Sequence, residues 1–110
     1  MKKIVIDEEF QGWPSGDFKP ILSASVTIDE IANLIGSKLV EGTDDLGEFL
    51  ATFFSIEDIG PVVVVRHYND PKKNAVINVD REVVTNLVVP EIINILRLDK
   101  SSVSWVQTRC

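Results

Sequence analysis

The only histidine of this 110-residue sequence, His67, is the first candidate for acid–base chemistry. Imidazole is the side chain most often used to move protons near neutral pH, but it needs an orienting partner. No serine, cysteine or carboxylate lies at a spacing that would fix such a partner beside His67. The sequence also lacks HExxH, G-x-S-x-G and glycine-rich phosphate-binding motifs. We therefore expect no catalytic residues and a function other than catalysis.

Acidic residues stand at both ends of the stretch TDDLGEFLATFFSIED, residues 43–58. Carboxylates can ligate a divalent cation, but these do not have the spacing of a calcium-binding loop, so we expect neither a metal site nor a cofactor. Two interpretations stay open: an acidic surface for a basic partner, or the solvated ends of a core element. The acids concerned are Asp44, Asp45, Glu48, Glu57 and Asp58.

A second candidate for partner binding is Trp13, in a segment that contains Gly12, Pro14 and Gly16. Asp17 follows it closely, and aromatic side chains beside acids are typical of binding hot spots for basic partners. The alternative is that Trp13 folds back over the core, because large aromatic side chains are mostly buried.

An alternative site would lie on a β-hairpin of residues 62–80, whose turn is predicted at residues 69–74. Closing this hairpin would place Tyr68 opposite Ala75 and His67 opposite Val76. Val64 and Ile77 would then share one face, and Val63 and Asn78 the other. A small-molecule-binding or enzymatic domain could use the sheet face around His67. The polar residues of that candidate pocket are Arg66, His67, Asn78 and Asp80.

Two helices are predicted from capping and periodicity. Thr27 and Glu30 form the pattern of a capping box, and apolar residues at helical spacing follow to about residue 40. Pro90 fits the first position of a second helix, over about residues 90–98. Each helix has one apolar side, so we expect both to pack on one face of a sheet.

Residues 44–56 fit a helix by the spacing of their apolar residues, and a strand by the run Thr52-Phe53-Phe54. The turn-forming Gly60-Pro61 and the β-branched run after it favour the strand. The expected fold is therefore α+β, with an antiparallel sheet built on a three-stranded meander over residues 49–80 plus outer strands. Residues 1–110 are expected to form a single domain.

The sequence is acidic, with a net charge of −6 and a pI near 4.6. Residues 1–60 contain 12 acids and 4 bases, whereas residues 61–110 contain 5 acids and 7 bases. This balance disfavours nucleic acid and favours a basic protein partner. A single cysteine excludes an internal disulfide, and the sequence has neither a membrane-spanning stretch nor a signal peptide, so we expect a cytoplasmic protein.

A short, acidic, motif-free α+β chain resembles the immunity proteins of bacterial toxin–immunity systems. The acids at 44–48 and 57–58 carry the resemblance, together with Asp7, Glu8 and Glu9. The resemblance implies an inhibitor that covers the basic active site of a toxin domain. The sequence leaves open a third possibility, a structural module that oligomerises through an exposed strand edge.

Overall fold

Seven strands and two α-helices make up the described part of the chain. The computed structural model describes residues 4–6, 18–45, 47–57, 59–69, 74–82 and 84–106. The strands are β1 (Ile4–Ile6), β2 (Phe18–Ala24), β3 (Leu39–Asp44), β4 (Gly47–Ile56), β5 (Gly60–His67), β6 (Ala75–Asp80) and β7 (Val103–Val106). The helices are α1 (Ile28–Ile35) and α2 (Thr85–Ile95), and a 3-10 turn (Lys100–Ser102) precedes β7.

The strands form one sheet in the order β1-β4-β5-β6-β2-β7, and every neighbouring pair is antiparallel. Strand β3 pairs with residues 47–52 of β4, and β1 pairs with residues 54–56 of the same strand. The two short strands therefore share one side of β4. The predicted α+β class and antiparallel sheet are confirmed.

Helix α1 begins as predicted but is shorter. The backbone N–H of Glu30 donates to the Thr27 hydroxyl at 3.2 Å, which caps the first turn. The helix ends at Ile35 because Gly36 adopts a left-handed conformation, with φ of 83°, and its N–H closes the last turn on Ala32. The prediction that this helix continues to residue 40 is wrong, and Leu39 starts a strand.

Helix α2 also differs from its predicted bounds. It begins at Thr85 and ends at Ile95, so Pro90 lies inside it and not at its first position. A proline there removes the hydrogen bond to the carbonyl four residues earlier, which disfavours a helix. Burial of Val88, Val89 and Ile92 in the core offsets that loss. The prediction that Pro90 begins the helix used only neighbouring residues, so it could not include this tertiary packing.

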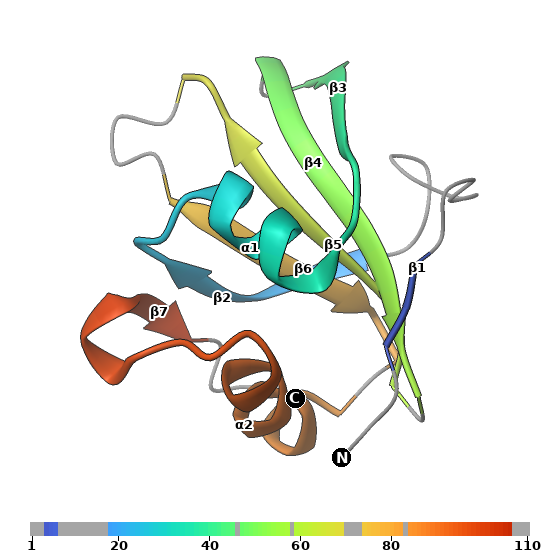
Figure 1. The fold of residues 1–110 in the computed structure, drawn as a ribbon, viewed down its shortest axis with the longest axis vertical. Coiled ribbons are helices and arrows are strands. Elements are labelled where there is room, and N and C mark those ends of the chain that lie inside the picture. The colour runs from blue at the N-terminus through green and yellow to red at the C-terminus, as the bar shows by residue number, and fades with distance from the viewer. Residues whose placement is uncertain are drawn as a thin grey trace.

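Residues 47–56 form strand β4, so the choice of a strand over a helix is confirmed. Both faces of the strand are packed: Phe49 and Ala51 are buried on one face, whereas Phe54 and Ile56 are buried on the other. Strand β4 is the longest strand of the sheet at 10 residues, and it pairs with β1, β3 and β5. Its two ends therefore lie at opposite edges of the molecule (Figure 1).

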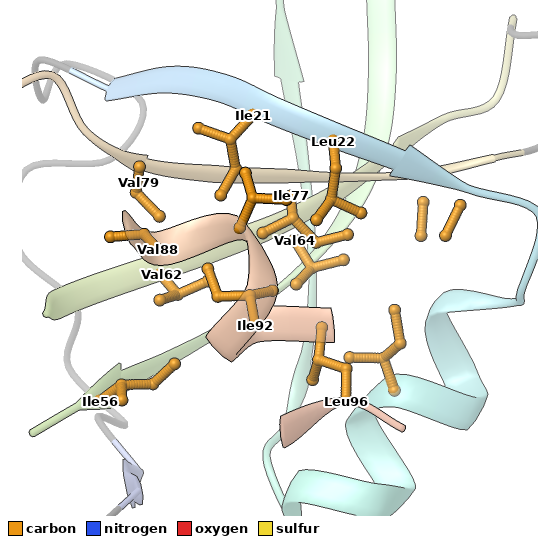
Figure 2. Close-up of a cluster of buried hydrophobic side chains, with 14 of the residues drawn as sticks. Ile21, Leu22, Ile56, Val62, Val64, Ile77, Val79, Val88, Ile92 and Leu96 are labelled. Carbon is orange, nitrogen blue, oxygen red and sulfur yellow. The ribbon is translucent and has the colours of Figure 1, made fainter. Parts of the chain in front are cut away.

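The main core lies between the helices and one face of the sheet, called here the helix face. Figure 2 shows Val88 and Ile92 of α2 packed toward side chains of β2, β5 and β6. Ile28 and Ile31 of α1 belong to the same cluster. The strand residues of this cluster include Leu22, Ala24, Phe54, Ile56, Val62, Val64, Ala75, Ile77 and Val79. Within the described residues, no helix is long and apolar enough to span a membrane.

The opposite face of the sheet carries a smaller apolar cluster, formed by Phe49, Ala51, Val63 and Val65. Its residues alternate along β4 and β5 with those of the helix face.

The β5–β6 register differs from the predicted one by two residues, because Val65, not His67, lies opposite Val76. Since side chains alternate with a period of two, this correction leaves every residue on its predicted face.

Candidate functional site

The hairpin of β3 and β4 brings three of the predicted acids together. Asp44 closes β3 opposite Gly47, Asp45 is exposed in the turn between the strands, and Glu48 is exposed near the start of β4. Gly47 has φ of 118°, a conformation that side chains rarely adopt, so glycine is what permits this tight connection. The three acids therefore lie at one end of the sheet.

Strand pairing adds two residues that the sequence analysis missed. Thr43 lies directly opposite Glu48, and Glu41 lies opposite Leu50. Glu41 and Glu48 are thus diagonal neighbours on the helix face, about 7–8 Å apart. The sequence analysis assigned residues up to 40 to a helix and therefore did not recognise β3. Recognising Gly36 as the helix end would have revealed a strand at residues 39–44.

Tyr68 completes this group from the neighbouring strand. Its backbone N–H donates to the carbonyl of Glu48 at 3.0 Å, which extends the β4–β5 ladder by one residue. The Tyr68 side chain is 45% exposed, and the Arg66 guanidinium lies 6.0 Å from the centroid of its ring. The exposed ring of Tyr68 thus belongs to the strand position opposite the exposed Glu48, with the Arg66 guanidinium near the ring.

These residues line an open recess of about 300 Å³, called here the acidic recess. It lies at the hairpin end of β3 and β4, which extends beyond α1 at the top of Figure 1. Carboxylates and an aromatic face together suit a guanidinium or ammonium group, through ion pairing and cation–π attraction. The lining residues are Glu41, Gly42, Thr43, Glu48, Phe49 and Tyr68.

Phe49 gives the recess a rigid support. Its side chain is only 3% exposed, and its ring lies edge-on to His67, with centroids 5.8 Å apart. The ring also covers Gly42, where an added Cβ would stand 2.5 Å from Phe49 Cζ. An aromatic ring across a strand glycine fixes the pairing of the two strands. The buried ring on the opposite face therefore fixes the pairing of the two strands that carry the acids of the hairpin.

Glu57, a further predicted partner-binding residue that the structure describes, does not join the acidic recess. Glu57 is exposed just beyond the far end of β4, roughly 30 Å from Glu48 at about 3.3 Å per residue. The predictions for Trp13, Asp17 and Asp58 fall outside the described residues. The structure thus separates Glu57 from the acids at positions 44–48, as expected for a strand.

The polar residues of the alternative pocket are dispersed. Arg66 and His67 are neighbours in β5, so their side chains lie on opposite faces. Asn78 shares a face with His67 but lies opposite Val63, four residues along β5, which corresponds to roughly 13 Å. The three polar groups therefore do not converge on one substrate-sized site.

Two of these residues also make local hydrogen bonds. Asn78 is 9% exposed, and its Nδ2 donates to the carbonyls of Val63, at 3.3 Å, and Val76, at 3.2 Å. Asp80 accepts a hydrogen bond from the backbone N–H of Glu82 at 2.9 Å. These bonds satisfy buried or turn-forming backbone groups, which is a structural use of the two side chains.

Within the described residues, no group of three or more His, Cys, Asp or Glu side chains is arranged to hold a metal ion. Comparisons of the chain with protein-family models, curated proteins and solved structures give no match.

Proposed function

We propose that this protein is an inhibitory binding protein of the immunity type, which neutralises a basic toxin domain by binding it at the acidic recess. The observation that carries the proposal is the placement of the Glu41 and Glu48 carboxylates beside the half-exposed ring of Tyr68. Interfaces are dominated by a few anchors of this aromatic and charged kind. The resemblance of the chain to immunity proteins supplies the inhibitory role.

The charge around the recess suits rapid capture of a basic surface. Residues 41–48 contain Glu41, Asp44, Asp45 and Glu48 and no base. Opposite fields raise association rates, and the effect falls with ionic strength because the Debye length is about 8 Å at physiological salt. The proposal therefore predicts association that slows as salt is added.

The geometry also provides an anchor for one basic side chain. Glu41 and Glu48 repel each other as diagonal neighbours, and a cation between them would relieve that repulsion. Tyr68 lines the same recess, and the Arg66 guanidinium lies 6.0 Å from the centroid of its ring. An inserted arginine that pairs with a carboxylate would therefore share the ring with Arg66. Such a desolvated pair slows dissociation more than a pair on the rim.

The test is a comparison of two single-charge variants against a basic toxin domain encoded beside this protein. Glu48→Gln removes a charge from the recess, and Glu57→Gln removes the same charge at the far end of β4. We expect Glu48→Gln to weaken binding by about 1–3 kcal/mol and to reduce rescue of cells that make the toxin. Glu57→Gln should change binding by less than about 0.5 kcal/mol.

Equal effects of the two variants would show that only net charge matters and would refute the assignment of the recess. Association rates measured by stopped flow in low and high salt give an independent check. Rates that do not change with salt would refute electrostatic capture.

A further inference from the structure

The outer backbone edge of strand β3 has no strand partner within the part of the chain that the structure describes. Among the described residues, β4 is its only strand partner. The N–H of Tyr68 donates to the carbonyl of Glu48, so the backbone groups of Glu48 point toward β5. Because the directions of the backbone groups alternate along an antiparallel strand, those of Phe49 and Ala51 point toward β3. The backbone groups of their partners, Gly42 and Val40, therefore point toward β4. The groups that point away from β4 are those of Leu39, Glu41 and Thr43.

This edge has one usual protecting feature, the charged Glu41, but it lacks a bulge and a proline. The pairing of β3 with β4 runs without a bulge from Leu39 to Asp44, and the strand contains no proline. Leu39 is 38% exposed and Val40 is 43% exposed, and their side chains lie on opposite faces. A regular edge with exposed apolar side chains is a template for another strand.

We infer that the partner adds an extended basic segment to β3 as an additional antiparallel or parallel strand. This inference rests on the proposed function and specifies its binding mode. Side chains of the added strand would alternate between the two faces of the sheet. Those on the helix face would meet Glu41 and the acidic recess, whereas those on the opposite face would meet Val40. The matching segment therefore alternates Lys or Arg with apolar, β-branched residues.

Charge favours such a segment over a second copy of this chain. An antiparallel pair of β3 with itself, centred on Glu41, would place Glu41 of one copy opposite Glu41 of the other. Like charges across neighbouring strands are destabilising. A basic strand instead places opposite charges across the new pairing and completes the backbone hydrogen bonds of the edge.

The test uses a blocked eight-residue peptide that alternates Arg and Val, titrated against the whole protein by NMR. We expect binding, with hydrogen exchange of the Leu39, Glu41 and Thr43 amides slowed at least tenfold in the complex. A matched peptide, N-methylated at every second residue on the side that faces β3, keeps all charges but loses its donors. It should bind at least tenfold more weakly, and a Glu–Val peptide should not bind.

Protein variants separate charge from backbone pairing. Glu41→Gln should weaken binding of the Arg–Val peptide severalfold while the slowed exchange persists at saturation, and Glu57→Gln should leave affinity unchanged. Equal binding of the parent and methylated peptides would overturn strand addition while leaving the acidic recess as a charged site. No binding of the parent peptide would overturn the inference, and toxin rescue would still decide the proposed function.

A second copy as the occupant is tested in the same experiments. A free protein that dimerises with rising concentration, and whose three edge amides are already protected, would overturn the inference in favour of self-pairing.

Discussion

The contact between Phe49 and Gly42 leads to the most quantitative prediction. An alanine Cβ at position 42 would stand 2.5 Å from Phe49 Cζ, 2.9 Å from Cε1 and 3.2 Å from Cε2. Ordinary carbon contacts are about 3.5–4.0 Å, so the ring would have to move by roughly 1 Å. It is buried against Ala51 and Val65, which restrict that movement. Gly42→Ala therefore overpacks the smaller apolar cluster.

The expected magnitude combines two opposing effects. Overpacking of a dense core costs about 1–3 kcal/mol. Replacing glycine by alanine within a strand gains about 0.5–1 kcal/mol, because the unfolded chain loses freedom. The net result for Gly42→Ala is a loss of about 0.5–2 kcal/mol in the free energy of unfolding. At about 4 °C per kcal/mol for a domain of this size, Tm should fall by about 2–8 °C.

A double-mutant cycle with Phe49→Leu isolates this contact, because leucine lacks the ring atoms that approach position 42. In that background, Gly42→Ala should become neutral or stabilising by about 0.5–1 kcal/mol. Urea denaturation followed by circular dichroism measures the four free energies. A similar m value in all four proteins would show that the unfolded states are comparable.

Gly36→Ala serves as the control, because Gly36 has a positive φ but nothing within 4 Å of an added Cβ. Its cost, about 1–2 kcal/mol from the left-handed conformation, should be the same with Phe49 or Leu at position 49. The reasoning about the ring fails if Gly42→Ala destabilises both backgrounds equally, within about 0.5 kcal/mol.

Two further substitutions test the hydrogen bonds that hold the elements of the fold. Asn78→Asp places a carboxylate against the carbonyls of Val63 and Val76, where the amide now donates. We expect the free energy of unfolding, measured by urea denaturation at neutral pH, to fall by about 2–4 kcal/mol. A fall of less than about 1 kcal/mol would contradict the donor role of Nδ2. Thr27→Ala removes the hydroxyl that accepts from the N–H of Glu30, and a loss of about 1 kcal/mol is expected, whereas Thr27→Ser should retain most of the stability.

The two faces of the sheet were predictable from alternation alone. The sequence analysis placed Val64 and Ile77 on one face and Val63 and Asn78 on the other, and the structure buries the first pair beneath the helices. The predicted hairpin register was displaced by two residues, yet the faces remained correct because side chains alternate with that period. The assignment of faces is thus more robust than the choice of opposing residues.

The acidic recess was only partly predictable. Asp44, Asp45 and Glu48 are close in sequence and stay close in the hairpin, but Glu41 and Tyr68 come from elements whose pairing partners depend on the whole sheet. The local signal at Gly36 indicated the end of the helix, yet the apolar Leu39 extended the helical pattern and hid strand β3. The missed strand removed three lining residues, Glu41, Gly42 and Thr43, from the prediction.

The sequence by itself determined the α+β class, the cap of α1, a strand over residues 49–56 and the separation of Glu57 from the acids at positions 44–48. These features depend on spacing within a few residues, where neighbouring side chains and backbone groups interact directly. Only the tertiary structure decided that β3 has no strand neighbour beyond β4 among the described residues, and that Tyr68 lines one recess with Glu41 and Glu48. Those arrangements depend on which strands pair and in what register, because packing of the shared core across distant segments selects them.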